Sequence, residues 1–241
     1  MRYAFIADIH GNAQALAAVL GEIDSLGIAS IFCLGDIVGY GAEPSRCIAT
    51  IRDRNIPTIV GNHDLAAARA LSIENFNDNA KASAEWTYNH LTNLEKDFLK
   101  ALPLEFKNHD FQLAHGAPMD PAAFDYILTP ADAVLTFGAM ERALLFTAHS
   151  HVPLGLVWNG KEISASPMGS VVIPPNARAI VNVGSVGQPR DGSPLAALAL
   201  WDSESREASV VRVEYDVDTA ARKILDAGLP EGNAYRLSLG R

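Results

Sequence analysis

The strongest constraint in this 241-residue sequence is a repeated pattern, in which a short apolar run is followed at once by Asp, Asn or His. The first run is residues 3–7, and Asp8 and His10 follow it directly. The run is too short for a helix and is flanked by turn residues, so it predicts a buried strand. Four later runs are followed in the same way by Asp36, Asn62-His63, His115 and His149-Ser150-His151. The pattern therefore places a set of polar side chains just beyond strand ends.

The first sixty residues alternate between strand and helix. Strands are predicted at 3–7, 30–34 and 57–60, and helices run from Asn12 to about Ser25 and from Pro44 to about Arg54. This alternation favours a parallel sheet. Because ligands of such sheets gather at the carboxyl ends of the strands, Asp8, Asp36 and Asn62 are expected to meet there.

The rest of the chain is less regular. Residues 65–103 are helical and polar, with helices near 78–90 and 94–101, and we interpret them as a helical insertion within a single domain, residues 1–241. The insertion is either a plain connection or a cap that helps to select the substrate. The later elements suggest an antiparallel or mixed sheet, with a hairpin turn at Asn159-Gly160 and helices at 130–137 and 216–227. Two short strands are predicted within 104–115, and further strands near 144–148, 156–158, 171–173, 179–183, 195–201 and 208–215.

Composition narrows the class of protein. The net charge is −9 and the basic residues are scattered, which argues against an extended nucleic-acid surface. Cys33 and Cys47 lie in patterns typical of packed, reduced thiols. No apolar run approaches the roughly 20 residues of a membrane helix, and the chain enters its first strand without a charged leader. We therefore expect a cytoplasmic protein that does not insert into membranes.

Five of the seven histidines follow apolar strand-like runs, close to Asp8, Asp36 and Asn62. A single histidine in such a place is usually structural, but five together indicate a metal site. Imidazole and carboxylate ligands suit Mn, Fe, Co, Ni and Zn, and no cysteine is placed to form a structural zinc site. The supply of ligands exceeds the need of one tetrahedral ion, so we predict two divalent transition-metal ions.

These motifs resemble those of the calcineurin-like metallophosphoesterase superfamily, in the same order along the chain. The residues that carry the resemblance are Asp8-x-His10, Gly35-Asp36, Gly61-Asn62-His63-Asp64, His115-Gly116 and Ala148-His149-Ser150-His151. Residues 182–192 also resemble a loop of the small bacterial and archaeal phosphodiesterase-like branch. The resemblance implies an α/β fold, with two packed mixed β-sheets flanked by helices.

The resemblance also implies a site. One ion would be held by Asp8, His10, Asp36 and His151, and the other by Asp36, Asn62, His115 and His149, so that Asp36 bridges them. His63 would assist the leaving group, as a general acid or by stabilising developing charge. The implied function is a metal-dependent phosphoric ester hydrolase, which attacks small phosphodiesters or nucleotides with a metal-bridging hydroxide.

Other functions stay open at this point. A phosphomonoesterase or a dinucleoside polyphosphate hydrolase would use the same centre. A non-catalytic interaction module on this fold would not need the full set of ligands that this chain keeps. A mononuclear iron oxygenase, with two histidines and a carboxylate, would leave Asn62 and three histidines without a role.

The chain departs from the family pattern at two informative positions. Many relatives carry Asp and Arg where this chain has Gly39 and Tyr40, which weighs against the Ser/Thr protein phosphatase branch. The expected partner of the catalytic histidine and the expected phosphate-binding arginine are both missing. Arg190 is a candidate for the phosphate contact, and the alternative is an ordinary surface arginine. Ala148 and Ser150 replace Gly and Thr beside the histidine pair, where neither is expected to be a ligand.

Overall fold

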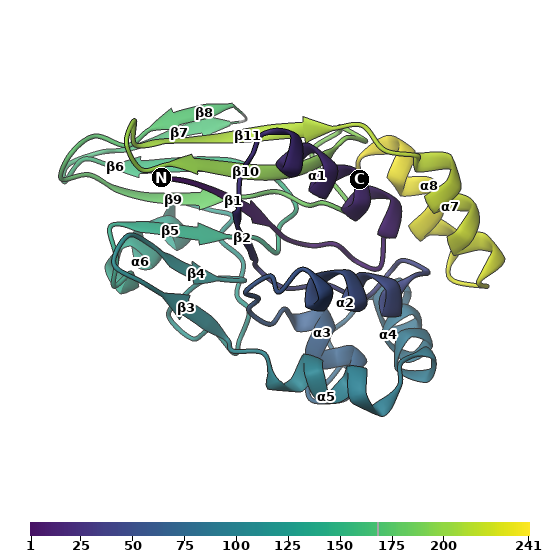
Figure 1. Ribbon diagram of the computed structural model, residues 1–241. Helices are drawn as coiled ribbons and strands as arrows, with labels where there is room; N and C mark the ends of the chain where they lie inside the picture. Colours follow the sequence, from purple (N-terminus) through teal and green to yellow (C-terminus); the bar gives the residue numbers. More distant parts are fainter. Residues whose placement is uncertain (168) are drawn as a thin grey trace.

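Two mixed β-sheets lie face to face in the computed structural model, which describes residues 1–167 and 169–241 (Figure 1). The first sheet has the order β2 (Ser30–Cys33), β1 (Arg2–Ile6), β10 (Ala196–Asp202), β11 (Glu207–Val213) and β8 (Ser170–Val172). The second has the order β3 (Glu105–Lys107), β4 (Gln112–Ala114), β5 (Leu144–Thr147), β9 (Arg178–Asn182), β6 (Leu154–Trp158) and β7 (Ile163–Pro167). The expected fold class is confirmed.

The core between the sheets is built from aromatic side chains. Because successive residues of a strand point to opposite faces, Phe5 of β1 faces the second sheet, while its neighbours Ala4 and Ile6 face the helices. The Phe5 ring stacks on Phe146 of β5 at 3.8 Å between centroids and meets Phe111 edge-on at 5.2 Å. Such pairs add about 0.5–1.5 kcal/mol beyond the burial of their area. The sheets are thus joined firmly below the edge where the strands end.

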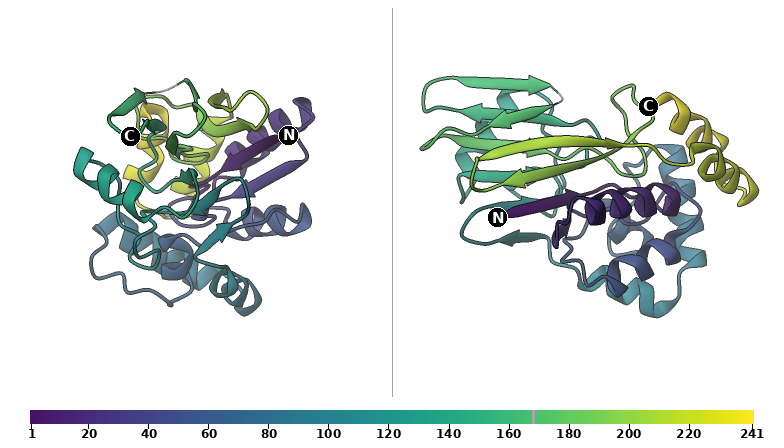
Figure 2. Two further views of the ribbon diagram at one scale, coloured as in Figure 1. Left: turned by 90° about the vertical axis from the view of Figure 1, so that its left-hand side faces the viewer. Right: turned by 45° about the horizontal axis from the view of Figure 1, so that its top comes forward.

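Helices cover the outer faces of both sheets (Figure 2). On the first sheet, α1 (Ala13–Ser25) and α2 (Pro44–Asp53) pack through one apolar cluster, and α6 (Pro130–Ala139) covers the second sheet. At one end, α7 (Val217–Asp226) and α8 (Glu231–Leu239) pack on Trp86 of α4 (Asp78–His90), whose indole N–H donates to the carbonyl of Ala227 at 3.0 Å. The order of layers is therefore helix, sheet, sheet, helix.

Residues 65–103 are largely helical, as predicted from their polar periodicity. They contain α4, α5 (Asn93–Ala101) and the end of α3 (Asn62–Ala67). Whether this segment is a cap for the substrate stays a prediction. Among the helices that the structure describes, none has the length and apolar character needed to cross a membrane.

The strand predicted at 57–60 is wrong. The segment runs beside β2, but it forms only one isolated bridge, between Cys33 and Thr58, because Gly61 ends it and Asn62 at once begins α3. The parallel sheet is also only partly right, since β1 pairs with β2 in parallel and with β10 antiparallel. Helix α8 and strand β7 were not predicted, although the expected turn at Asn159-Gly160 does join β6 to β7.

Candidate metal centre

The ends of β1, β2, β4 and β5 bring the predicted side chains together in one buried centre. Two groups have the geometry to hold a metal ion, in that their ligand atoms lie within 4.8 Å of one another. The first group consists of Asp8, His10 and His151, and the second of Asp36, His115 and His149. All six side chains are buried. Six of the seven predicted ligands therefore converge, although they are spread over 144 positions from Asp8 to His151.

The chain turns sharply at these strand ends. Five of the six residues have a left-handed backbone, with φ of 50° at Asp8, 49° at His10, 52° at Asp36, 69° at His149 and 61° at His151. This conformation costs a non-glycine residue roughly 1–2 kcal/mol. Backbone hydrogen bonds maintain it, among them His10 N–H to the carbonyl of Asp36 at 2.9 Å and Gly187 N–H to that of Asp8 at 2.9 Å. Strain of this kind is concentrated where side chains must point inward to a site.

Three imidazoles are oriented by backbone carbonyls. The Nδ1 atoms of His10, His115 and His151 lie 3.1, 2.7 and 2.6 Å from the carbonyl oxygens of Val38, Leu34 and Gln188. Because a carbonyl only accepts, each Nδ1 carries the proton and each Nε2 turns a lone pair inward unless the ring is charged. This is the arrangement of metal-ligating histidines.

The first group is shaped for a cation. Burial holds the pKa of His10 and of His151 well below the usual range, so both rings are neutral. Their Nε2 atoms nevertheless approach to 3.1 Å, lone pair toward lone pair. Asp8 Oδ1 lies 3.7 Å from His151 Nε2 and is buried without a hydrogen-bond partner among the described residues. Orphaned buried acceptors are rare, and here a divalent ion would satisfy all three atoms.

Asp36 lies between the two groups. Its Oδ1 accepts the backbone N–H of His63 at 2.8 Å. Its Oδ2 lies 3.3 Å from His115 Nε2 in the second group and 3.7 Å from His10 Nε2 in the first. The Oδ1 of Asn62 is also buried without a partner in the described part of the chain. One carboxylate oxygen is thus within reach of an ion in either group.

Without bound metal, the buried carboxylates of the centre are balanced by protons. Burial raises the pKa of Asp8 to about 7 against the opposing charge of His115. Burial lowers the pKa of His115, but the charge and hydrogen bond of Asp36, the charge of Asp8 and the Leu34 carbonyl together outweigh it and raise this pKa to about 9. Burial alone would raise the pKa of Asp36. The charges of His115 and His63 oppose this effect, and the pKa of Asp36 lies well below its usual range. A proton on His115 therefore occupies the place that a divalent cation would take, and the ion would displace it.

His63 is the second residue of α3 and its ring lies 5.0 Å from that of His10, but no carboxylate of the described residues accepts a hydrogen bond from the His63 ring. Its Nδ1 is buried without a hydrogen-bond partner among the residues described, and a Cβ added at Gly39 would lie only 2.9 Å from that atom. The rings of Tyr40 and Phe76 flank the imidazole at 4.6 and 4.9 Å between centroids. Aromatic contacts therefore position His63, in place of the aspartate that the family pattern has at position 39.

The loop at 182–192 forms one wall of the centre. The Ser185 hydroxyl donates to the carbonyl of Asp8 at 2.8 Å, and the Gln188 carbonyl accepts from His151. Arg190 donates from Nη2 to Gln188 Oε1 at 2.8 Å, and its guanidinium lies 5.7 Å from the centroid of the Tyr40 ring. After burial, the charge of Arg190 is the largest influence that lowers the pKa of His151. Arg190 therefore lies beside the centre, and its role as the phosphate contact stays a prediction.

Several contributors were not predicted from the sequence. Asp64 is buried and accepts the backbone N–H groups of Gly61 and Val38 at 3.0 and 3.2 Å, which ties the Asn62 turn to the Asp36 loop. Gln188 and Tyr126 were also missed. Asp64 is the last residue of the Gly61-Asn62-His63-Asp64 motif, so its position was a usable signal. Tyr126 lies in an irregular segment that offered no such signal.

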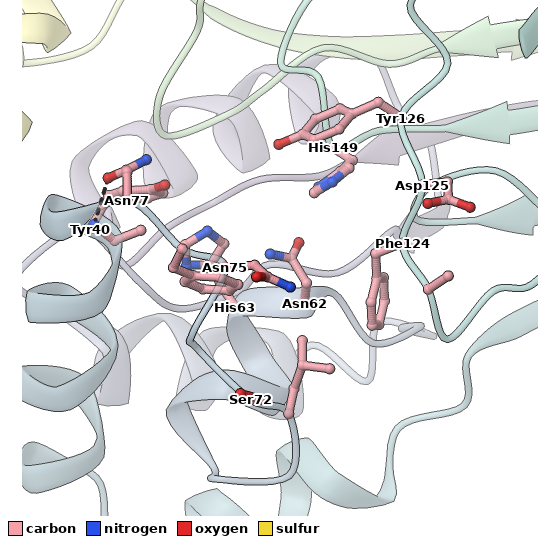
Figure 3. Close-up of a pocket in the computed structure, with 14 residues that line it drawn as sticks. Tyr40, Asn62, His63, Ser72, Asn75, Asn77, Phe124, Asp125, Tyr126 and His149 are labelled. Carbon is pink, nitrogen blue, oxygen red and sulfur yellow. Dashed lines mark hydrogen bonds between the residues drawn. The ribbon is translucent and has the colours of Figure 1, made fainter.

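A cavity of about 370 Å³ opens directly beside the centre (Figure 3). Asn62, His63 and His149 form the part of its wall that belongs to the centre. Most of the remaining wall comes from residues 71–77, before α4, and 123–126, before α6, and Tyr40 and Ala80 complete it. The centre is therefore reached from a chamber large enough for a small organic group.

Comparisons with known proteins agree with this geometry. A family model described as the calcineurin-like phosphoesterase superfamily domain matches residues 1–206. The protein MJ0912 of Methanocaldococcus jannaschii is 38% identical over 243 residues, which cover 99% of this chain and 98% of that protein.

Two solved structures have the same architecture over the whole chain. A metallophosphoesterase from Sphaerobacter thermophilus aligns with a TM-score of 0.87 and 35% identity, and covers 100% of this chain and 99% of its own. The hypothetical protein PH1004 from Pyrococcus horikoshii OT3 aligns with a TM-score of 0.80 and 24% identity, over 100% of this chain and 98% of that chain, and it supports the fold alone.

Proposed function

The chain belongs to the calcineurin-like phosphoesterase superfamily, and from this premise we propose that it is a dinuclear metal-dependent phosphoesterase acting on small phosphodiesters or nucleotides. The observation that carries the proposal is the position of Asp36 Oδ2 between two buried Asp/His groups. One carboxylate shared in this way is suited to a pair of ions rather than to a single one.

We assign the ligands by group. Asp8, His10, Asp36 and His151 would hold one ion, and Asp36, Asn62, His115 and His149 the other. When bound, two divalent ions lower the pKa of a water between them and polarise a phosphoryl group for in-line attack. The assigned ligands bring two negative charges, those of Asp8 and Asp36, so positive charge would remain to attract an anionic substrate, even on a chain with net charge −9.

Two other side chains would act on the substrate. His63 faces the cavity and would lie beside the leaving-group oxygen. Arg190 is within electrostatic reach of both groups, because its charge influences the pKa of His151 in the first and of His149 in the second. We propose that Arg190 binds the phosphate in place of the arginine that the family pattern has at Tyr40.

Metal replacement tests the proposed function. Protein stripped with a chelator is expected to have no activity on a generic aryl phosphodiester, and to regain it with one or more of Mn, Fe, Co, Ni and Zn. Elemental analysis of the active form is expected to find about two ions per chain. Absence of turnover with every one of these metals would overturn the proposal and favour an interaction module on the same fold.

Arg190→Ala is expected to lower kcat/KM for phosphate esters by about 10- to 100-fold. A charge-assisted hydrogen bond contributes about 1.5–3 kcal/mol, and each 1.4 kcal/mol is a factor of ten. Metal content should not change, because Arg190 is not a ligand. Arg46→Ala, which removes an exposed arginine paired with Glu43, is the matched control. Steady-state kinetics indistinguishable from those of the unmodified protein would remove Arg190 from the site.

A further inference from the structure

We propose that the cavity beside the metal centre binds the base of a nucleoside phosphate, so that the preferred substrates are nucleotides rather than sugar or simple alkyl phosphates. We call this cavity the aromatic chamber and define it by Tyr40, Phe76, Phe124 and Tyr126 together with the polar residues named below. The inference rests on the proposed function and narrows its substrate class.

The chamber is continuous with the centre. Asn62, His63 and His149 line both, so a phosphate held at the centre places its organic group in the chamber. In Figure 3, His63 and Asn75 lie toward one side of the space, and Phe124 and Tyr126 toward the other. Its two walls come from the segments before α4 and before α6, which are distant in sequence. A flat group can enter between them.

Each aromatic ring of the chamber contacts a histidine of the centre. Tyr126 stacks on His149 with centroids 3.9 Å apart and planes inclined by 19°, and Phe76 lies 4.9 Å from His63. Phe124 is buried and meets His115 edge-on at 5.9 Å. Rings that are already held in place lose little freedom when a ligand binds. Phe76 is partly exposed and Tyr126 is exposed, so both offer stacking surfaces, and stacking on aromatic side chains is how proteins hold bases without reading their sequence.

The polar side chains of the chamber match the edge of a base. Ser72, Asn75 and Asn77 line it and carry both donors and acceptors, and Asn77 is fixed by its cap bond to the backbone N–H of Ala80 at 3.0 Å. A base presents ring nitrogens and exocyclic groups to such side chains. An alkyl group would make no hydrogen bond with these side chains. A sugar could pair with them, so the experiment must separate base from sugar.

The size of the chamber sets an upper limit. Its volume of about 370 Å³ lies near the lower end of the roughly 300–1,000 Å³ of ligand pockets. It fits one nucleoside rather than two. The net charge is −9 and the basic residues are scattered along the sequence, which argues against an extended basic surface for the phosphate backbone of a longer nucleic acid. The occupant is therefore a mononucleoside group.

Competition between AMP and ribose 5-phosphate tests the inference, because the two ligands share phosphate and sugar and differ in the base. With metal-loaded protein, calorimetry is expected to find that AMP binds at least about tenfold more tightly than ribose 5-phosphate, equivalent to about 1.4 kcal/mol. The same ratio is expected between their inhibition constants in aryl phosphodiester hydrolysis. Phe76→Leu, which keeps an apolar side chain but removes the ring, should bring AMP close to ribose 5-phosphate.

The controls separate this inference from the function beneath it. Tyr235→Ala removes an exposed aromatic side chain of α8 that does not line the chamber, and it should keep the preference for AMP. Equal affinities for AMP and ribose 5-phosphate in an active enzyme would overturn the base site and leave the phosphoesterase intact. A preference that survives both Phe76→Leu and Tyr126→Ala would overturn the placement of the base in this chamber. Absence of any metal-dependent turnover would instead count against the proposed function.

Discussion

Asp36→Asn is expected to abolish the binding of both metal ions and to lower kcat for phosphodiesters by about 10³-fold or more. Replacing residues that merely support a ligand already costs about 10–100-fold in metal affinity or activity. Asp36 is placed to serve both ions at once, since its Oδ2 lies 3.3 Å from His115 Nε2 and 3.7 Å from His10 Nε2. An amide keeps the shape but removes one of the only two negative charges assigned to the centre.

The thermal stability of the Asp36→Asn variant distinguishes loss of metal binding from misfolding. In the metal-free protein, Asp36→Asn removes one of three buried carboxylates, and so it relieves the repulsion of Asp36 with Asp8 and Asp64 as well as breaking the contact with His115. We expect the metal-free variant to fold cooperatively. The rise in Tm that metal produces in the unmodified protein should disappear. A ligand stabilises the folded state by RT ln(1 + [L]/Kd), and this quantity falls to zero when the metal no longer binds.

Thermal unfolding with and without Mn, together with elemental analysis, measures this effect. Asp53→Asn, at the exposed end of α2, controls for the removal of a carboxylate in general and should behave like the unmodified protein. A variant of Asp36 that still takes up two ions and hydrolyses the diester at the normal rate would contradict the assignment of the bridging carboxylate.

Most of this centre was predictable because its ligands follow strand ends. Asp8, His115 and His149 each come directly after a short apolar run, and the carboxyl ends of parallel strands meet at one edge. This argument did not require every strand to be right. Residues 57–60 are not a regular strand, yet Asn62 is still buried in the cavity wall beside His63, because the segment stays hydrogen-bonded to Cys33 of β2.

The surroundings of the centre were less predictable, since they depend on contacts between distant segments. Nothing local to Tyr126 indicates that its ring will stack on His149, and Phe76 meets His63 only because the chain turns back between α3 and α4. Strand β7 was missed for a related reason. Its sequence, Ile-Ser-Ala-Ser-Pro, is weakly apolar, and it is ordered by pairing with β6.

The two departures from the family pattern are linked in space. Gly39 leaves room for the His63 imidazole, since a Cβ there would lie 2.9 Å from Nδ1, and Tyr40 packs on the same ring. Arg190 in turn lies over Tyr40. The missing aspartate and arginine are thus matched by an aromatic contact and by an arginine from another loop, which together keep a histidine and a guanidinium beside the centre.

This arrangement predicts how His63 acts and how its loss will appear. Burial lowers the pKa of His63 to about 4, and two bound cations would lower it further. The ring is therefore neutral near pH 7. Its buried Nδ1 has no acceptor among the described residues, and an unpaired N–H costs more than an unpaired lone pair, so the proton belongs on Nε2. We expect His63 to donate a hydrogen bond to the leaving-group oxygen rather than to transfer a proton as a cation.

His63→Ala is accordingly expected to lower kcat by about 10²–10³-fold, the usual effect of removing one donor to developing charge, while metal content stays near that of the unmodified protein. The loss should be larger for alkyl esters, whose leaving oxygens build up more charge, than for p-nitrophenyl esters. The rate of the unmodified protein should also show no decline as the pH rises through about 6.5, because no imidazolium is needed. His109→Ala, at a fully exposed histidine, is the control. If the loss were equal for alkyl and nitrophenyl esters, the His63 side chain would instead act by its packing against Tyr40 and Phe76 and not on the leaving group.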